Sequence, residues 1–289
     1  MIKNQQMSPS FQRHKEDFAY CERVIKKHSR SFYAAFSTLP KEKAMSVYAI
    51  YAFCRKADDV VDEESDLKAL MQLRKELELF EKGEEIDHPV WRSLRVVFQT
   101  YPMDIAPFYD MLTGQEQDLT FRQPKTQEEL EDYCYYVAGS VGLMLLPLLT
   151  DRPEDYQEEA IALGAAMQIT NILRDVGEDL ENNRVYLPKD VMAAHGYTMD
   201  MLENKEINAN FIQLWEFEAQ KAENYYEKSL HLVYNMNKDA KKPLLLSLLF
   251  YREILNAVRS NDYQCFEKRN VVDKRKQLEL LQEANGLLS

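Results

Sequence analysis

The sequence predicts an all-α protein, and three observations lead to this prediction. Helix-forming residues dominate, and apolar residues recur three and four positions apart along most of the chain. Only 8 glycines and 10 prolines occur in 289 residues, which leaves few positions for tight turns. The 17 tyrosines and 13 phenylalanines predict an aromatic-rich interior. We therefore expect one all-α domain over residues 1–289, in which residues 1–17 are a candidate disordered segment.

The individual helices follow from start and stop signals along the chain. Thr126 with Glu129 forms a capping-box pattern, and Asp151 with Glu154, with Pro153 between them, marks another helix start. The main breaks between helices lie at residues 82–89, 121–125 and 181–188. In chain order we predict helices at residues 11–28, 40–63, 66–82, 89–101, 104–120, 127–149, 153–179, 207–235 and 239–262, with shorter ones at 188–204 and 271–286.

Charge and cysteine usage exclude some classes of protein. A net charge of −12 disfavours nucleic-acid binding, which normally requires a basic face. The longest apolar runs, 141–149 and 244–251, are shorter than the roughly 18–20 residues that span a bilayer, and the N-terminus lacks the apolar core of a signal peptide. The cysteines form no CxxC pair, and we expect them to be reduced core residues of a cytoplasmic protein: Cys21, Cys54, Cys134 and Cys265.

A carboxylate stripe ends the helix predicted at 40–63. Residues three and four apart share a helix face, so Asp58 and Asp62 point the same way, about 6 Å apart at roughly 1.5 Å per residue. Tyr51 and Arg55 stand on the same stripe, so the acids continue an apolar face rather than oppose it. Burying carboxylates there is costly unless cations or basic groups pair with them. The pattern favours a metal site over a solvated helix surface.

A second stripe is longer and more specific. Gln168, Asn171, Asp175 and Asp179 follow the same spacing without a gap, and Arg174 lies beside them. Amide and carboxylate oxygens without His or Cys suit a hard cation, and Mg²⁺ fits best. Mg²⁺ usually takes one or two carboxylates and fills its other positions with water and phosphate oxygens. We expect the two stripes to meet across an apolar cavity, with the acids at its mouth and a diphosphate completing the metal cage.

Two weaker signals accompany the stripes. His28, Ser29, Arg30 and Ser31 lie between two predicted helices, where hydroxyl, backbone N–H and guanidinium groups suit a phosphate. The basic tract at 267–276 is typical of a solvated helix surface and indicates no site by itself. No GxGxxG, GxxxxGK[ST] or GxSxG motif occurs, so the sequence gives no support to a nucleotide-binding or serine-hydrolase function.

Four segments, in this order and spacing, resemble the squalene/phytoene synthase family, most of all its bacterial dehydrosqualene (4,4′-diapophytoene) synthases. They are HSRSF (28–32), YAIYAFCRKADDVVD (48–62), YCYYVAGSVG (133–142) and QITNILRDVGEDLENNRVYLP (168–188). The resemblance covers about residues 18–276. It implies an all-α isoprenoid-synthase fold around a central apolar cavity. Two prenyl diphosphates would condense head to head in this cavity, with Mg²⁺ bound by both acidic stripes.

The resemblance also implies roles for single residues. The implied metal ligands are Asp58, Asp62, Asn171, Asp175 and Asp179. Tyr133 matches a tyrosine near the reacting carbons, and it joins the four aspartates and Arg174 in the predicted catalytic set. The implied substrate-binding residues are His28, Ser29, Arg30, Ser31, Tyr51, Arg55, Gln168, Asn171, Arg174 and Tyr251, with Phe32 and Phe36 lining the cavity. The family's late diphosphate-binding arginine falls in a stretch with one extra residue here, so either Lys268 or Arg269 supplies it.

The implied reaction joins two molecules of farnesyl diphosphate through presqualene diphosphate to dehydrosqualene, the first step of C30 carotenoid biosynthesis. Two or three Mg²⁺ ions would draw charge from the leaving diphosphate. Squalene synthases add a hydride from NADPH and usually carry a C-terminal membrane anchor. This sequence shows neither a nucleotide motif nor such an anchor, so we expect no NADPH requirement. We expect a cytoplasmic enzyme whose contact with a membrane surface is transient and serves product release.

Three alternatives stay open from the sequence. A phytoene synthase of the same family would use geranylgeranyl diphosphate, and cavity depth would decide between the two substrates. A head-to-tail prenyl elongase or a terpene cyclase also uses acidic helices and Mg²⁺, but an elongase normally carries a second DDxxD where this chain has DVGED. A non-catalytic helical scaffold or assembly factor is expected to have lost the metal-binding acids, and all four aspartates are present here.

Overall fold

The computed structural model describes residues 7–62 and 67–288, except for the side chain of Asp62, and confirms the all-α prediction. Within those ranges every regular element is a helix. In chain order these are α1 (Pro9–Arg13), α2 (Lys15–His28), α3 (Arg30–Phe36), α4 (Lys41–Asp62), α5 (Leu67–Glu81), α6 (Pro89–Thr100), α7 (Ala106–Leu119), α8 (Gln127–Cys134), the π-helix η1 (Tyr135–Gly139), α9 (Ser140–Leu149), the 3₁₀-helix η2 (Pro153–Tyr156), α10 (Gln157–Arg174), α11 (Val176–Glu181), α12 (Lys189–Ala194), α13 (Met199–Glu203), α14 (Ala209–Asn235), α15 (Lys238–Ser260) and α16 (Lys274–Leu287).

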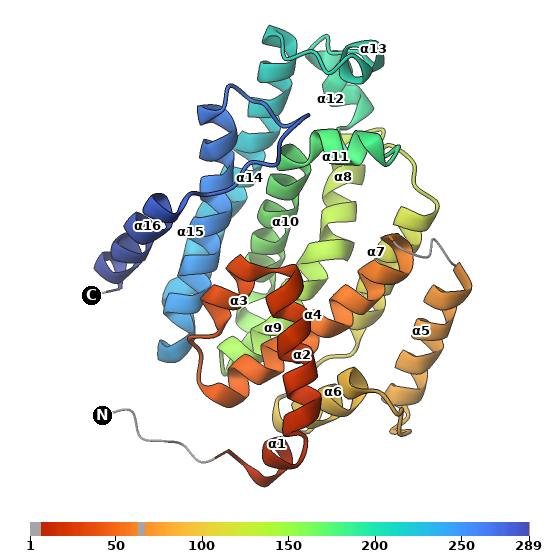
Figure 1. Ribbon diagram of the computed structural model, residues 1–289, viewed down its shortest axis with the longest axis vertical. Helices are drawn as coiled ribbons and strands as arrows, with labels where there is room; N and C mark the ends of the chain where they lie inside the picture. The colour runs from red at the N-terminus through yellow and green to blue at the C-terminus, as the bar shows by residue number, and fades with distance from the viewer. Residues whose placement is uncertain (1–6, 63–66, 289) are drawn as a thin grey trace.

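Helix α10 lies at the centre of the bundle. Figure 1 shows α14 and α15 on one side of it and α8 on the other, and these helices, together with η1 and α9, contact α10. The N-terminal helices complete the bundle, because α4 and α7 pack on α9 and α3 packs on α15. Small residues allow the close approach, since α10 buries Ala162, Gly164, Ala165 and Ala166. Gln168 and Asn171, in the C-terminal half of α10, line a cavity together with residues of α3, α4 and α7.

The N-terminal region begins its helices slightly earlier than the sequence predicted. Residues 1–6 lie outside the described residues, α1 occupies 9–13, and α2 follows from residue 15, so the helix predicted at 11–28 is divided in two and starts at residue 9. The physical reason is burial: Phe11 is fully buried and stacks on Phe18 with ring centroids 4.9 Å apart. The short helix α3 was not predicted. Only Ser29 separates it from the end of α2, and it begins inside the segment 28–31 that was expected to lie between two helices.

The segment predicted as one helix at 127–149 contains a π-helical turn. It starts as predicted, because the Thr126 side chain accepts a hydrogen bond from the Glu129 backbone N–H at 3.3 Å. The turn η1 then presses its backbone against α10 at Gly164. A Cβ added to Gly164 would lie only 2.4 Å from the Ala138 carbonyl oxygen, so only glycine permits this contact. Such widened turns are common at functional sites, and this one lies beside the cavity described below.

The segment predicted as one helix at 153–179 is also divided. It starts with the 3₁₀-helix η2, so the α-helix begins at Gln157 rather than after Asp151. It breaks at Asp175, between α10 and α11. The following turn is fixed by distant chain, because the Gly177 N–H donates to the Cys265 carbonyl at 3.0 Å. A Cβ on Gly177 would lie 2.0 Å from the Phe266 carbonyl oxygen, so this packing requires glycine.

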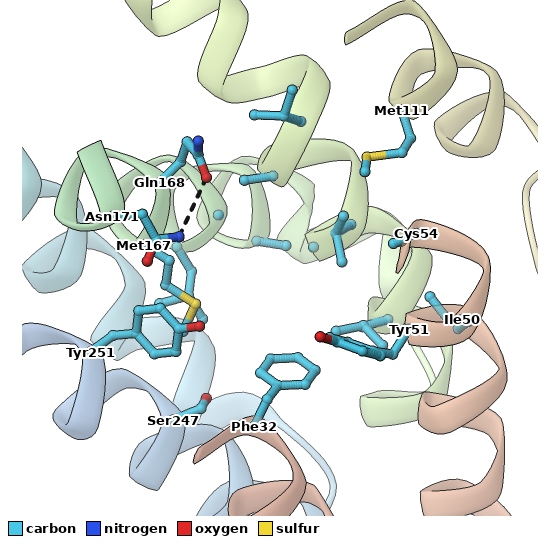
Figure 2. Close-up of a pocket in the computed structure, with 18 of the residues that line it drawn as sticks. Phe32, Ile50, Tyr51, Cys54, Met111, Met167, Gln168, Asn171, Ser247 and Tyr251 are labelled. Carbon is cyan, nitrogen blue, oxygen red and sulfur yellow. Dashed lines mark hydrogen bonds between the residues drawn. The ribbon is translucent and has the colours of Figure 1, made fainter. Parts of the chain in front are cut away.

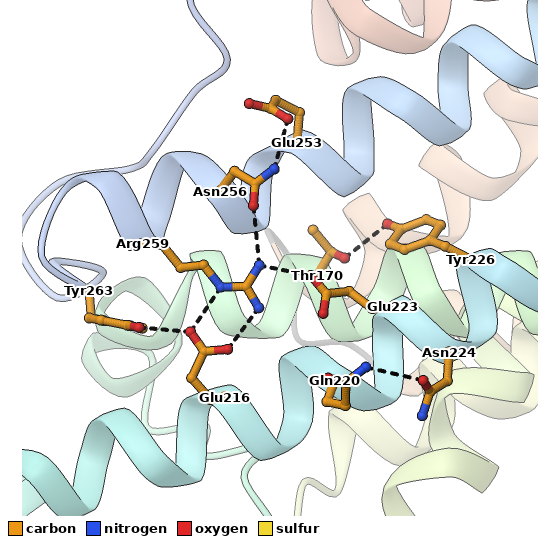
Figure 3. A network of polar contacts seen from close by, with 10 residues as sticks. All are labelled: Thr170, Glu216, Gln220, Glu223, Asn224, Tyr226, Glu253, Asn256, Arg259 and Tyr263. Carbon is orange, nitrogen blue, oxygen red and sulfur yellow. Dashed lines mark hydrogen bonds and ion pairs between the residues drawn. The ribbon is translucent and has the colours of Figure 1, made fainter. Parts of the chain in front are cut away.

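An arginine network joins the two long C-terminal helices. Arg259 of α15 donates to both carboxylate oxygens of Glu216 at 2.8 and 2.7 Å and to Glu223 at 2.8 Å, both on α14 (Figure 3). Tyr263 donates to the same Glu216 at 2.7 Å. The bidentate geometry fixes the register of α15 against α14. It lies outside the cavity lining and supports the helices that carry part of that lining.

The prediction that the cysteines are unpaired core residues is confirmed. All four are described, and each is a buried free thiol. Burial raises the pKa of Cys21 and of Cys265 to about 12, so these thiols stay protonated near neutral pH. They act as small core residues.

One helical stretch among the described residues, 127–149, is long and apolar enough to cross a membrane by length and composition. The sequence showed only a nine-residue apolar run there. The stretch meets the length criterion for a membrane span because α8, η1 and α9 follow one another without a break. Half of the apolar window is buried inside the fold. A buried core helix passes the same test, so this stretch does not assign the chain to a membrane.

Candidate active site

A cavity of about 370 Å³ lies between α10 and the N-terminal helices. Its apolar lining includes Phe32, Phe36, Ile50, Met111, Val141, Leu145, Leu146, Leu149, Leu163, Met167, Leu232 and Leu244. Its polar lining includes Ser29, Tyr51, Asp58, Gln115, Asp118, Tyr133, Gln168, Asn171, Arg184, Tyr186, Ser247 and Tyr251. Figure 2 shows Gln168 and Asn171 on one side and Tyr51 on the opposite side. Residues of both predicted stripes therefore face one cavity.

The first stripe is held at Asp58 by a neutral partner. Gln115 of α7 is buried and donates from Nε2 to Asp58 Oδ1 at 2.7 Å. One turn before Asp58, Arg55 forms an ion pair with Asp59. The Nε of Arg55 is buried and has no hydrogen-bond partner among the described residues. A buried donor without an acceptor is costly, so an anion arriving at this stripe would satisfy it. The side chain of Asp62 lies outside the described residues.

The second stripe is divided between the cavity and the helix break. Gln168 and Asn171 line the cavity and are joined by a 3.5 Å hydrogen bond (Figure 2). Asp175 lies at the break, where Arg174 donates to its two oxygens at 2.7 and 2.5 Å and Arg269 at 3.3 Å. Of the two candidates for the late arginine, Arg269 thus reaches the second stripe.

Asp179 lies behind the cavity, in a small pocket that it shares with Arg184 and Tyr186. Burial, and then the charges of Asp175 and Glu178, raise the pKa of Asp179 to about 8. Nearby positive charge from Arg184 opposes this shift but does not cancel it. In the protein alone, the positive charge near Asp179 therefore does not balance burial and its acidic neighbours. A bound divalent cation would reverse the local balance.

The donor set fits a hard cation with an incomplete protein shell. Within 7–62 and 67–288, no three His, Cys, Asp or Glu side chains converge into a ready-made metal cage. The oxygen donors are instead spread over Asp58, Asn171, Asp175 and Asp179. That arrangement suits Mg²⁺, which commonly keeps several waters and binds through a few carboxylates plus substrate phosphates. The predicted ligand set stays a prediction.

The other predicted substrate contacts divide between the cavity wall and the surface. Phe32 and Phe36 line the cavity with ring centroids 4.5 Å apart, and Phe32 lies 6.0 Å from the Tyr51 ring. Of the four polar residues 28–31, Ser29 lines the cavity, whereas His28, Arg30 and Ser31 are exposed next to it. Their position at the start of α3 places them beside the polar end of the lining.

Five polar lining residues were not singled out from the sequence: Gln115, Asp118, Arg184, Tyr186 and Ser247. Asp118 accepts hydrogen bonds from Tyr133 at 3.0 Å and from Tyr186 at 2.9 Å. Arg184 and Tyr186 fall inside the motif that carries the family resemblance, which was a usable signal. Gln115 and Asp118 share a face of α7 three positions apart, but their surroundings, GQEQDL, offered no signal of their own.

Comparison with known proteins identifies the family. The model described as squalene/phytoene synthase matches residues 25–276. The 15-cis-phytoene synthase of Synechococcus elongatus is 35% identical over 274 residues, which cover 89% of this chain and 88% of that protein. A solved dehydrosqualene synthase in complex with a ligand is 50% identical with a TM-score of 0.94, and the match covers 96% of this chain and 99% of that one. A squalene synthase from Alicyclobacillus acidocaldarius is 26% identical with a TM-score of 0.79, covering 87% and 96%.

The chain therefore belongs to the squalene/phytoene synthase family, as its motifs predicted. Members of this family are prenyltransferase-type enzymes of isoprenoid and carotenoid biosynthesis. They act on prenyl diphosphates and use a divalent metal. The described cavity, apolar along most of its wall and rich in carboxylate, amide and hydroxyl groups elsewhere, is a suitable shape and chemistry for such substrates.

Proposed function

We propose that this chain condenses two molecules of farnesyl diphosphate head to head, through presqualene diphosphate, to dehydrosqualene. The observation that carries the choice of substrate is the 50% identity to a dehydrosqualene synthase over 96% of the chain. Identity to the phytoene synthase of Synechococcus elongatus is lower, at 35% over 89% of the chain. In this proposal the reaction is the first step of C30 carotenoid biosynthesis.

The polar part of the cavity would hold the diphosphates. Arg55 offers a buried N–H that lacks an acceptor, and Tyr51 lies on the same helix face at the cavity. Arg174 and Arg269 surround Asp175 on the opposite stripe and would exchange part of that contact for phosphate oxygens. His28, Ser29, Arg30 and Ser31 would contribute from the start of α3. Tyr251, on the cavity wall, would contribute from α15.

Asp58, Asp62, Asn171, Asp175 and Asp179 would hold two or three Mg²⁺ ions. When bound, Mg²⁺ supplies Lewis-acid stabilisation of the negative charge on the departing diphosphate. Gln115 orients Asp58 for this role without offsetting its charge, because an amide is a neutral donor.

The apolar wall would protect and guide the carbon chemistry. Leucine, methionine and phenylalanine side chains exclude water that would otherwise capture an allylic cation. The faces of Phe32, Tyr51 and Tyr133 present electron-rich surfaces, each worth about 0.5–2 kcal/mol to a nearby cation. The second substrate's double bond attacks the cation, and loss of a proton closes the cyclopropane ring. A second ionisation, rearrangement and proton loss then give the thirty-carbon triene without a hydride donor.

A second candidate is phytoene synthesis from geranylgeranyl diphosphate. It is supported by the similarity of this chain to the 15-cis-phytoene synthases of Synechococcus elongatus and Synechocystis, each at 35% identity. Both candidates use the same polar residues. They differ in how much apolar chain the cavity accepts.

Product analysis tests the proposal directly. Purified protein is incubated with Mg²⁺ and either farnesyl or geranylgeranyl diphosphate, with and without NADPH, and products are separated by chromatography. We expect a conjugated C30 triene from farnesyl diphosphate with no need for NADPH, and no product when EDTA removes the metal. Phytoene from the longer substrate alone would establish the second candidate. An absolute need for NADPH would contradict a final step without hydride transfer. If no product formed under any condition, the non-catalytic scaffold alternative would be favoured.

A further inference from the structure

One carboxylate holds two tyrosines at the wall of the cavity. Asp118 Oδ2 accepts the hydrogen of Tyr133 at 3.0 Å, and Oδ1 accepts that of Tyr186 at 2.9 Å. The three residues come from α7, from α8 and from the segment after α11, so they connect parts of the chain that are far apart in sequence. All three line the cavity.

The two phenol rings form a single unit. Their centroids are 5.0 Å apart and their planes are inclined by 27°, which is a stacked arrangement. Tyr186 is buried and is further packed edge-on against Phe121, with centroids 5.1 Å apart. Burial raises the pKa of Tyr133 well above its usual range, so its phenol keeps its hydrogen and remains a donor. The rings are therefore fixed in position by stacking and in rotation by the carboxylate.

This arrangement decides what the tyrosines offer to a substrate. An ionised carboxylate only accepts hydrogen bonds, so both phenols must direct their hydrogens toward Asp118. What remains for the cavity is electron-rich: the ring faces and the oxygen lone pairs. The negative charge behind the two rings adds to their attraction for a cation.

We infer that Asp118 is a positioning residue that turns the Tyr133–Tyr186 pair into an electron-rich wall for the carbocations of the reaction. This inference rests on the proposed function, because it assigns a role within that chemistry. Without Asp118, each phenol would be free to rotate its hydrogen toward the cavity or the diphosphate. The pair would then lose both its orientation and the charge behind it.

The chain contains a matched control for this arrangement. Asp110, also on α7, accepts the hydrogen of Tyr135 at 2.6 Å. This tyrosine–carboxylate hydrogen bond joins α7 to the π-helix η1, as the bond from Tyr133 to Asp118 joins α7 to α8. Neither Asp110 nor Tyr135 belongs to the cavity lining. If activity were lost only because α7 is held less firmly, replacing Asp110 by alanine should therefore lower activity as much as replacing Asp118 by alanine.

The test compares Asp118→Ala, Asp118→Asn and Asp110→Ala in steady-state and single-turnover assays with farnesyl diphosphate and Mg²⁺. We expect Asp118→Ala to lower kcat about 100-fold, as misplaced groups do, with KM changed less than about threefold. Released presqualene diphosphate should rise relative to triene, because the cation that follows it is less well stabilised. Asp118→Asn, which keeps one acceptor, should fall between wild type and Asp118→Ala, and Asp110→Ala should keep wild-type kcat and product ratio.

A double-mutant cycle with Tyr133→Phe separates positioning from a merely structural role. If Asp118 acts through the phenol, adding Asp118→Ala to Tyr133→Phe should cost much less than it does in the wild-type background. Fully additive losses, or equal losses in Asp118→Ala and Asp110→Ala, would overturn the inference while leaving the proposed function intact. If the wild-type protein formed no product from either prenyl diphosphate, both the proposed function and this inference would be overturned.

Discussion

The two acidic stripes differ in what holds their carboxylates. On α4, Asp58 receives one hydrogen bond from the neutral amide of Gln115 and faces the cavity. At the end of α10, Asp175 is held by the guanidinium groups of Arg174 and Arg269. Helix α4 continues through its acids, whereas the second helix breaks at Asp175.

This difference separates two ways of preparing an acid for a cation. A neutral donor fixes a carboxylate and leaves its charge available, whereas a guanidinium fixes it and offsets the charge. At Asp58 the Gln115 amide fixes an oxygen without offsetting its charge, while the guanidinium of Arg55 interacts with this carboxylate electrostatically. A cation approaching Asp175 must share it with two arginines that donate hydrogen bonds to it. We therefore expect removal of the second-stripe aspartate to cost more stability than removal of Asp58.

The largest expected effect comes from removing one aspartate of each stripe. Asp58→Ala and Asp175→Ala should each lower turnover about 10³-fold, because several kcal/mol of charge stabilisation is lost. Their stabilities should differ. Asp58→Ala removes the hydrogen bond from Gln115, worth about 1 kcal/mol, whereas Asp175→Ala removes the bidentate carboxylate partner of the mostly buried Arg174, at about 3 kcal/mol. Turnover assays and urea denaturation followed by circular dichroism measure both quantities.

Asp155→Ala is a suitable control for these two variants, since this carboxylate of η2 lies outside the cavity lining. It should keep wild-type turnover and stability. Equal destabilisation of the Asp58 and Asp175 variants would erase the distinction between the stripes. Loss of the helical signal in both would mean that the acids are structural.

A smaller effect is expected from Gly177→Ala, which acts on the second stripe only. The new Cβ would meet the Phe266 backbone at 2.0 Å, so the segment that carries Arg269 must move away, at a cost of about 1–3 kcal/mol. We expect a higher Mg²⁺ concentration for half-maximal activity and a lower melting temperature. Gly286→Ala is the control: nothing lies within 4 Å of its Cβ, and alanine in a helix should be neutral or stabilising. An unchanged Mg²⁺ dependence in Gly177→Ala would show that the C-terminal segment does not tune the second stripe.

The smallest effect is the change in stability on replacing Glu218, a buried acid outside both stripes. Its titration must be known before any pH dependence of the active site is interpreted. Gln127 donates to its Oε2 at 3.2 Å, while its Oε1 has no partner in the described structure. Burial raises the pKa of Glu218 to about 7. Because the folded state holds this proton more tightly than the unfolded state, its contribution to stability is present below about pH 4.5 and is lost as pH rises through 7.

Glu218→Gln should remove this dependence and raise the free energy of unfolding at pH 8 by on the order of 2 kcal/mol, with little change at pH 4.5. Denaturation curves from pH 4.5 to pH 8 measure the difference. Parallel curves for wild type and variant would show that Glu218 titrates normally.

The sequence predicted the parts of the site that are local in the chain. The α4 stripe and the Gln168–Asn171 pair depend only on helical spacing, and Tyr51 and Asp58 of the stripe line one cavity with Gln168 and Asn171. Contacts between distant segments could not be predicted in this way. Gln115 reaches Asp58 across 57 positions, and Gly177 packs against the backbone of the distant residue Phe266. The helix predicted at 11–28 is divided into α1 and α2, and Phe11 of α1 is fully buried.

The contact between Arg269 and Asp175 spans 94 positions of the chain and therefore has a consequence during synthesis. A ribosome adding roughly 5–20 residues per second makes Asp175 on the order of 5–20 s before it makes Arg269. During that interval the nascent helix α10 has its C-terminal acid but not the distant guanidinium that will contact it. Until the C-terminal segment folds back over α11, the neighbouring Arg174 and water are the partners available to this carboxylate. The second stripe therefore reaches its final charge balance later in synthesis than the first, whose partner Gln115 follows Asp58 much sooner.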